Sequence, residues 1–246
     1  GHGAPPAPPA GPACLLLPAS DAAAVEIARQ QEGLRALGWR VVSSSPETIS
    51  RLGDKARLRG LAEELGLLAF LPVHYASPGE AEYPCILKSA SGEFGKDCHI
   101  VSGPAEADRR LGGPLTPAWV LQELVTGRIE HSTSVLADGG EILDAVGMVY
   151  EADCEAFVWP NVRKVGKSAR QVPREHLDVM RRFLKGYTGV CNFNYKVRAS
   201  GAPCIFEVNT RVGGDLACDA PRDRARALFL ALEALSGVAG AGAGRS

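Results

Sequence analysis

Hydrophobic and polar positions along the chain divide it into helices and strands. Apolar residues repeat at helical spacing in four segments, which predicts helices over 21–37, 55–65, 174–185 and 222–235. Short apolar runs between turn residues predict strands over 14–18, 39–43, 85–88, 99–101, 119–125, 132–137, 142–149, 190–197 and 204–208. Asp138-Gly139-Gly140 and Ser200-Gly201 each lie between two of these strands and indicate hairpins. The pattern therefore predicts an α+β protein, in which a β-α-β start precedes antiparallel hairpins.

The two ends of the chain differ in composition from the part between them. Residues 1–13 are almost entirely glycine, alanine and proline, so we expect a linker or tag that adds nothing to a core. Residues 237–246 have a similar composition, and we expect a flexible tail there. Between them, residues 14–53 form a short N-terminal α/β segment and residues 54–236 form the main domain.

Composition and charge narrow the class of protein. The chain has 246 residues, of which 46% are hydrophobic, which is enough to bury a real core. The net charge of -1 argues against a nucleic-acid partner. No apolar run approaches the ~20 residues of a membrane span, and no secretion signal is present, so we expect a cytoplasmic protein without a membrane partner. The seven cysteines are scattered and form no C-x-x-C pair, which favours free thiols over disulfides or a zinc site.

A glycine-bearing loop follows the strand that ends at Lys88. Ser91, Gly92, Phe94 and Gly95 lie in this loop, before the chain returns as a strand. Such a loop brings backbone N–H groups and a lysine near one point, which suits a phosphate. It matches neither the Walker loop nor the dinucleotide fingerprint. A hairpin turn with a solvated lysine is the alternative interpretation.

The most informative segment is the polar face of the strand near residue 207. Glu207, Asn209 and Arg211 alternate along the chain, so they share one face of a strand. A carboxylate, an amide oxygen and a guanidinium together suit a hard cation bridged to phosphates. Asn194 lies 13 residues earlier, on the strand joined through Ser200-Gly201, and we expect it beside Glu207. A polar strand face that is simply exposed to solvent is the alternative.

The strand end Gln122-Glu123-Leu124-Val125 is a third candidate. A strand end of this kind can present backbone groups to the edge of an adenine ring, and Glu130 just beyond it can accept hydrogen bonds from ribose hydroxyls. An edge strand that runs into a turn explains the segment equally well when it is considered alone.

Taken in order, these segments resemble one family. The ordered blocks are Gly53-Asp54-Lys55, Tyr83-Pro84-Cys85-Ile86-Leu87-Lys88, the glycine loop, Gln122-Glu123-Leu124-Val125-x-Gly127 and Phe206-Glu207-Val208-Asn209-x-Arg211. This set resembles the ATP-grasp superfamily over residues 14–236. The resemblance implies that ATP lies between two α+β subdomains, an ATP-lid subdomain over 54–125 and a C-terminal subdomain over 126–236. It also implies that residues 14–53 are a reduced remnant of a Rossmann-like domain.

The resemblance also implies a role for each candidate residue. Lys55 and Lys88 would lie at the phosphates of the nucleotide, with Lys88 also near the adenine, and a mobile loop that closes over the phosphates would contain Ser91, Gly92, Phe94 and Gly95. The adenine would be contacted by Gln122, Glu123, Leu124 and Val125, with Glu123 nearest its amino group. Glu130 would lie at the ribose. Asn194, Glu207 and Asn209 resemble magnesium ligands, and Arg211 resembles the group that steadies an acyl-phosphate. Arg163 and Lys167 lie where the family has basic residues near the γ-phosphate, although a solvated basic loop is equally consistent with this stretch.

The implied function is a magnesium- and ATP-dependent ligase that activates a small-molecule carboxylate, such as an amino acid or peptide, for attack by an amine. Two features depart from the family. Asn194 stands where many members have Asp, and only 54 residues precede Lys55, where the family usually has a complete Rossmann-like domain. These departures keep three alternatives open: a non-catalytic nucleotide-binding module, an excised domain of a larger ligase, and a phosphotransferase of similar fold. A homodimer or further domains of a longer chain are possible partners.

Overall fold

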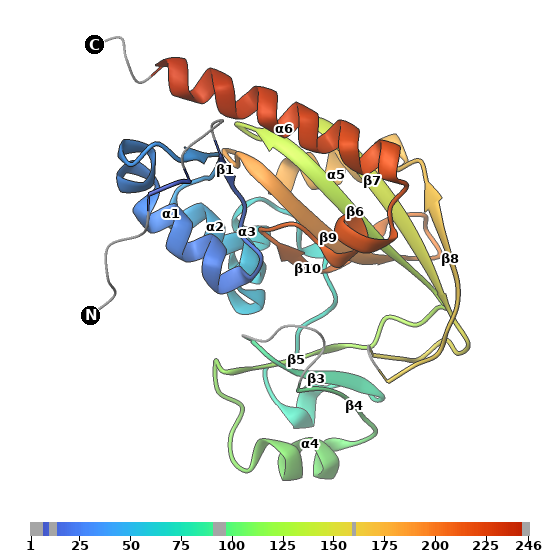
Figure 1. Ribbon diagram of the computed structural model, residues 1–246. Helices are drawn as coiled ribbons and strands as arrows, with labels where there is room; N and C mark the ends of the chain where they lie inside the picture. The colour runs from blue at the N-terminus through green and yellow to red at the C-terminus, as the bar shows by residue number, and fades with distance from the viewer. Residues whose placement is uncertain (1–6, 10–13, 91–96, 159–160, 243–246) are drawn as a thin grey trace.

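A large antiparallel sheet and a small one make up most of the structure (Figure 1). The computed structural model describes residues 7–9, 14–90, 97–158 and 161–242. The large sheet has the order β10-β9-β6-β7-β8. Its strands are β6 (Ile129–Asp138), β7 (Glu141–Ala152), β8 (Lys164–Arg170), β9 (Gly189–Val197) and β10 (Pro203–Asn209). Both predicted hairpins are confirmed, because β6 pairs with β7 and β9 pairs with β10, each in antiparallel register.

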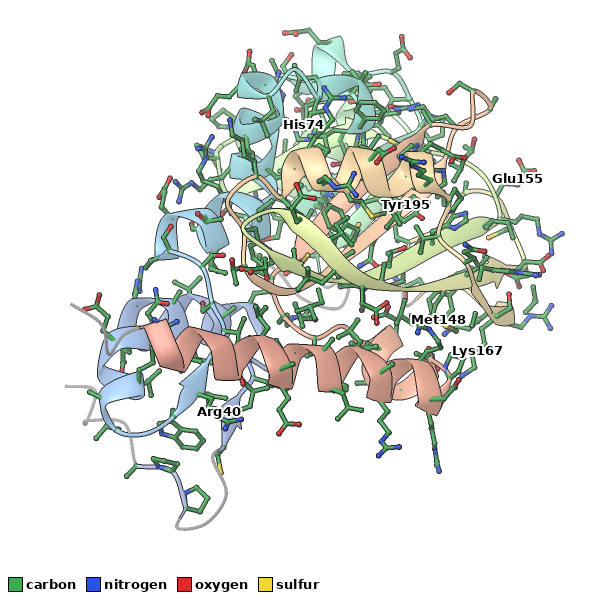
Figure 2. The ribbon with its side chains drawn as sticks, turned by 90° about the horizontal axis from the view of Figure 1, so that it is seen from above. Arg40, His74, Met148, Glu155, Lys167 and Tyr195 are labelled. Carbon is green, nitrogen blue, oxygen red and sulfur yellow. The ribbon has the colours of Figure 1, made fainter. Side chains whose placement is uncertain are left out.

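Strand alternation gives the large sheet two different faces. On β9, Cys191, Phe193 and Tyr195 are buried in the main core, together with residues of α5 (Arg174–Phe183). Figure 2 shows Tyr195 beneath α5. The side chains between them, such as Asn192 and Asn194, belong to the opposite face. One end of that face is covered by α6 (Arg222–Gly242), and the other end is left for polar residues.

The small sheet carries its own core. Its order is β4-β3-β5, with β3 (Cys85–Ser89) in the centre between β4 (Cys98–Val101) and β5 (Trp119–Glu123). Cys85, Leu87 and Leu121 are buried together against α4 (Pro104–Leu111). Ile86, Lys88 and Gln122 alternate with them and therefore lie on the opposite face of this sheet.

The N-terminal segment is a small α/β unit. Strands β1 (Leu15–Leu16) and β2 (Arg40–Val41) pair in parallel, and α1 (Asp21–Ala36) connects them, as predicted. Helices α2 (Pro46–Gly53) and α3 (Lys55–Glu64) follow. The sequence groups α3 with the small sheet, but its buried residues Leu58 and Ala62 pack in the core of the large sheet. Leu71 is the last residue of this core before the small sheet begins.

Several elements were not predicted from the apolar pattern. Helix α4 buries only Ala107 among its residues, so it has no apolar stripe. Helix α2 is short and begins with Ser45 as N-cap and Pro46 in its first turn. Strand β8 is partly or fully exposed along its length, so its basic sequence resembles a loop. Three short helical turns also form, at Leu68–Phe70, Pro78–Glu80 and Asp215–Asp219.

The last helix is longer than the sequence predicts. It ends at Gly242 rather than at residue 235, so residues 237–242 of the expected flexible tail have helical backbone. In the described parts of the chain, no helix is both long and apolar enough to cross a membrane.

Candidate active site

A cavity of about 500 Å³ lies between the polar faces of the two sheets. Figure 1 shows the small sheet set against the β9–β10 side of the large one. The predicted residues that line the cavity are Lys55, Lys88, Gln122, Glu123, Leu124, Val125, Glu130, Asn194, Glu207, Asn209 and Arg211. Four parts of the fold therefore contribute predicted site residues to one space: α3, the small sheet with the residues that follow it, β6, and the β9–β10 hairpin with the residues that follow it. The predicted loop residues Ser91, Gly92, Phe94 and Gly95 lie outside the described residues.

Glu207 is the centre of the polar cluster. Its register partner across the hairpin is Asn194, whose Nδ2 donates to Glu207 Oε1 at 3.0 Å. Asn209 Nδ2 lies 3.4 Å from the same oxygen, and Lys55 Nζ lies 3.2 Å from Oε2. Burial disfavours the ionised carboxylate, but the charges of Lys55 and Lys88 and the two amide bonds outweigh it and hold the pKa of Glu207 below its usual value. The sequence prediction that these residues lie together is confirmed.

This cluster fits a magnesium ion. Magnesium takes oxygen ligands and is usually held by one or two carboxylates together with substrate phosphates. Glu207 supplies one carboxylate, and the two amides already meet at Oε1. Rotation of the Asn194 amide by half a turn exchanges its nitrogen for its oxygen, and Asn209 already has an accepting oxygen, which faces Arg211 Nη2, so the three residues can supply oxygen ligands. Glu207, Asn194 and Asn209 are therefore the residues that would hold the ion.

Lys88 brings a buried cation from the small sheet to the large one. Its side chain is 7% exposed, and Nζ donates to the carbonyl oxygen of Phe206 at 3.2 Å. Burial lowers the pKa of Lys88 to about 8, although the nearby Glu207 carboxylate opposes this shift and the Lys55 charge adds to it. Lys55 begins α3, where Asp54 caps the helix through the amides of Ala56 and Arg57. The two lysines thus approach the same acid from different elements.

Arg211 is held from three sides. Its Nη2 donates to Asn209 Oδ1 at 3.2 Å, and Nη1 donates to the carbonyl oxygen of Val212 at 3.3 Å. Its Nε lies 3.1 Å from Oδ1 of Asp21, the first residue of α1. The guanidinium is thereby fixed beside the Glu207 cluster by a residue of the N-terminal segment, which the sequence reasoning did not connect to the site.

The end of β5 places Gln122 and Glu123 at the cavity. Gln122 is 4% exposed and lies on the same face of the small sheet as Ile86 and Lys88. Glu123 also lines the cavity, but its carboxylate accepts two hydrogen bonds from Arg198, at 2.6 and 2.7 Å. The place of Glu123 nearest an adenine amino group stays a prediction that its backbone groups could meet, since its carboxylate oxygens are engaged by Arg198. Gln122 is the polar side chain of this strand that is left to face the cavity.

Of the basic residues near residue 163, Lys164 lines the cavity, whereas Arg163 and Lys167 do not. Arg163 is largely exposed, pairs with Asp153 at 3.2 Å and does not line the cavity. Lys167 does not line it either, but its Nζ donates to Asp219, which does. Figure 2 shows Lys167 near the end of α6 that Asp219 precedes. Lys164, from the same strand, lines the cavity directly and lies over the Tyr150 ring.

Several lining residues were not found from the sequence. Asn192 and Lys196 flank Asn194 at a spacing of two, so strand alternation alone places all three on one face. Lys196 Nζ donates to the carbonyl oxygen of Val125 at 2.9 Å and lies 4.0 Å from the centre of the Phe157 ring. Asp215 and Asp219 follow the last strand in a helical turn, where no spacing rule applies. The cavity wall is therefore richer in charged groups than the motifs indicate.

Comparison with known proteins rests on structure. No protein-family model matches the sequence, and no curated protein is significantly similar to it. Among solved structures, D-alanine–D-alanine ligase from Bacillus anthracis aligns with a TM-score of 0.56 and 18% identity, over 81% of this chain and 70% of that one. L-amino acid ligase from Bacillus licheniformis aligns at 0.52 and 18%, over 82% and 56%. The chain has the ATP-grasp fold.

A further ATP-grasp neighbour is larger. The biotin carboxylase domain of the Hydrogenobacter thermophilus 2-oxoglutarate carboxylase aligns with a TM-score of 0.52 and 17% identity, over 78% of this chain and 47% of that one. That domain was solved with MgADP and bicarbonate. The chain thus spans 47% to 70% of the length of these three proteins. The likeness establishes the fold, and the chemistry must be argued from the site.

Proposed function

We propose that this chain binds MgATP and uses it to join a small-molecule carboxylate, such as an amino acid or a peptide, to an amine. The observation that carries the proposal is the convergence of Lys55, Lys88, Glu207, Asn209 and Arg211 on one cavity between two sheets. These five residues come from three elements and combine three cations with one carboxylate and one amide. That combination matches a triphosphate with its metal ion better than it matches a neutral ligand.

The residues divide the work of binding the nucleotide. Lys88 and Lys55 supply positive charge at the phosphates, and Ile86 and Gln122, on the same face of the small sheet as Lys88, provide a surface for the base. Asn194, Glu207 and Asn209 would hold magnesium, which would supply positive charge to neutralise the phosphates. Glu130 lines the same cavity and is the candidate for the ribose.

The proposed reaction has two steps. A carboxylate oxygen of the substrate attacks the γ-phosphorus, the bond to the β,γ-bridging oxygen breaks, and ADP leaves. The amine then attacks the acyl carbon, a carbon–nitrogen bond forms, phosphate leaves and the amine loses a proton. Neither step needs a side-chain nucleophile, so the protein acts by positioning and by charge. Arg211, held by Asp21 and Asn209, is the fixed cation that would steady the phosphoryl group during transfer.

The test is an ADP-release screen of the protein with pools of carboxylates and amines, in the presence and absence of magnesium. We expect ADP release that needs a carboxylate and an amine together. Glu207→Gln should keep the fold and some ATP binding but lose turnover, because it removes the one anionic member of the proposed metal set. Glu64→Gln is the matched control, since Glu64 pairs with Arg51 away from the cavity. Wild-type turnover by Glu207→Gln would contradict the metal assignment.

A non-catalytic nucleotide-binding module is the second candidate. It is favoured by one observation, that Asn194 is neutral and Glu207 already pairs with Lys55. A module of this kind, or a domain that needs the rest of a longer ligase, would bind ATP without turnover in every pool. A phosphotransferase would instead give a stable phosphorylated product without any amine.

A further inference from the structure

One acid in the cavity wall has partners unlike those of the others. Asp215 is 6% exposed and lines the cavity. Ser134 Oγ lies 3.2 and 3.1 Å from its two carboxylate oxygens, and Asn192 Nδ2 donates to Oδ1 at 3.0 Å. Ser132 joins the group, since Asn192 Nδ2 also donates to Ser132 Oγ at 2.9 Å. Every one of these partners is electrically neutral.

Three other acids at the cavity, Glu123, Glu207 and Asp219, have cations beside them. Glu207 pairs with Lys55, and Asp219 pairs with Lys167 and Lys164. Across the described residues, no lysine, arginine or histidine lies within ion-pair distance of Asp215. Burial correspondingly raises the pKa of the Asp215 carboxyl, and its hydrogen bonds only partly offset this. A buried carboxylate without a counter-charge is costly, so its place in a ligand cavity calls for a cation from outside the protein.

The backbone beside Asp215 is shaped to admit this carboxylate. A Cβ atom at Gly213 would lie 2.2 Å from Asp215 Oδ1 and 2.9 Å from Asn192 Cγ. Only glycine permits so close an approach of the chain to the acid. Gly213 and Gly214 also line the cavity, between Arg211 and Asp215 in the chain. The acid therefore lies in the wall of the same cavity as the arginine that we assign to phosphoryl transfer, and it is four residues further along the chain.

We propose that Asp215, with Asn192 and Ser132, binds the ammonium group of a substrate of this enzyme. A compact ammonium has N–H donors, and the Asp215 carboxylate and the Ser132 hydroxyl oxygen, which both line the cavity, can accept from them. The inference rests on the proposed function and names a part of its substrate. The ammonium belongs either to the attacking amine or to an amino acid that supplies the carboxylate.

The experiment compares nucleophiles of different charge in wild type and Asp215→Asn, with Asp144→Asn as control. Asp144 pairs with Arg224 and does not line the cavity. n-Propylamine is cationic at neutral pH and hydroxylamine is not. If the amine occupies the site, Asp215→Asn should raise KM for n-propylamine about tenfold to a hundredfold and leave KM for hydroxylamine within about twofold. If the amino acid occupies it, KM for L-alanine should rise and KM for propionate should not. KM values that stay unchanged for all four probes would overturn the inference.

Two further measurements keep the inference testable if turnover is absent or the variant is unstable. Calorimetry with n-propylammonium chloride and L-alanine, each in the presence of a non-hydrolysable ATP analogue and magnesium, should show binding of at least one to wild type and at least tenfold weaker binding to Asp215→Asn. Gly213→Ala moves the carboxylate without changing any charge, and it should reproduce the loss. Failure of the wild type to bind the ATP analogue would count against the proposed function. If the wild type binds the ATP analogue, but the ammonium probes bind wild type and both variants equally or bind none of them, the role of Asp215 is refuted and the proposed function is not.

Discussion

The Glu123–Arg198 ion pair yields the sharpest test of the site geometry. Arg198 donates to both oxygens of Glu123, and the backbone N–H of Val73 donates to Oε2 at 3.0 Å. The pair joins the last residue of β5 to the residue after β9, so it ties the small sheet to the large one. We predict that Glu123→Gln lowers the free energy of unfolding and leaves ATP affinity unchanged. The sequence-based interpretation predicts the reverse, since it places Glu123 at the adenine.

The size of the expected loss in free energy of unfolding follows from how exposed the Glu123–Arg198 pair is. The side chains are 25% and 29% exposed, so water screens part of the attraction. Breaking a fully buried pair costs about 3–5 kcal/mol, and an exposed one contributes about 0.2–1 kcal/mol. We therefore expect a loss of about 1–2 kcal/mol, which is a fall in Tm of roughly 2–8 °C for a chain of this size.

The loss of stability caused by Glu123→Gln should become smaller as the pH falls. The hydrogen bonds from Arg198 lower the pKa of Glu123 against the opposing effect of burial. An acid with a lowered pKa stabilises the folded state above its unfolded pKa of 4.5, and this contribution is lost as pH falls through the folded pKa. The difference in Tm between wild type and Glu123→Gln should therefore be full at pH 7 and shrink at acid pH.

Thermal unfolding and nucleotide calorimetry together decide whether Glu123 contributes to stability or to ATP binding. Gln122→Met, at the neighbouring position, is the matched variant, and it should weaken ATP binding because it removes the polar group that faces the cavity. A double-mutant cycle with Arg198→Met should give a coupling energy close to the loss from Glu123→Gln. Weaker ATP binding by Glu123→Gln at an unchanged Tm would refute our interpretation of the ion pair.

Three further predictions address single residues. Lys88→Ala should weaken ATP binding about tenfold to a hundredfold, because a charge-assisted hydrogen bond contributes about 1.5–3 kcal/mol, and equal calorimetric affinities would sink the assignment. Asn194→Asp places a second carboxylate opposite Glu207, so it should tighten magnesium binding to the ATP complex and lower Tm when magnesium is absent. A Tm of this variant that does not depend on magnesium would contradict the prediction. Burial lowers the pKa of His131 to about 4, so the unfolded state takes up its proton first and stability falls as pH drops from 6.5 toward 4. His131→Phe should flatten the Tm profile over that range, and an unchanged slope would exclude His131 as its source.

Strand alternation explains which parts of the site were predictable. Glu207, Asn209 and Asn194 lie on neighbouring strands of one hairpin, so spacing and the turn residues determine their meeting. The ion pair of Glu123 with Arg198 was not predicted, because the position of Arg198 depends on how the two sheets pack, which no local pattern encodes. The contact from Asp21 to Arg211 was missed for the same reason. Asp215 lies in a turn after two glycines, where spacing does not determine its neighbours. Its contacts with the neutral residues Asn192 and Ser134 depend on the tertiary fold, so they could not be predicted from the sequence.

The contacts of the site also bear on how the protein folds. Lys88 reaches Phe206 across 118 residues of sequence, and Arg211 meets Asp21, near the start of the chain. Contacts between such distant positions require large loops to close, which slows folding. During synthesis the small sheet, with local strand pairings, can form early, whereas the cavity cannot close until β10 has emerged. Until then Lys88 and the polar face of the small sheet are open to solvent, so a growing or truncated chain has a folded lid without a nucleotide site.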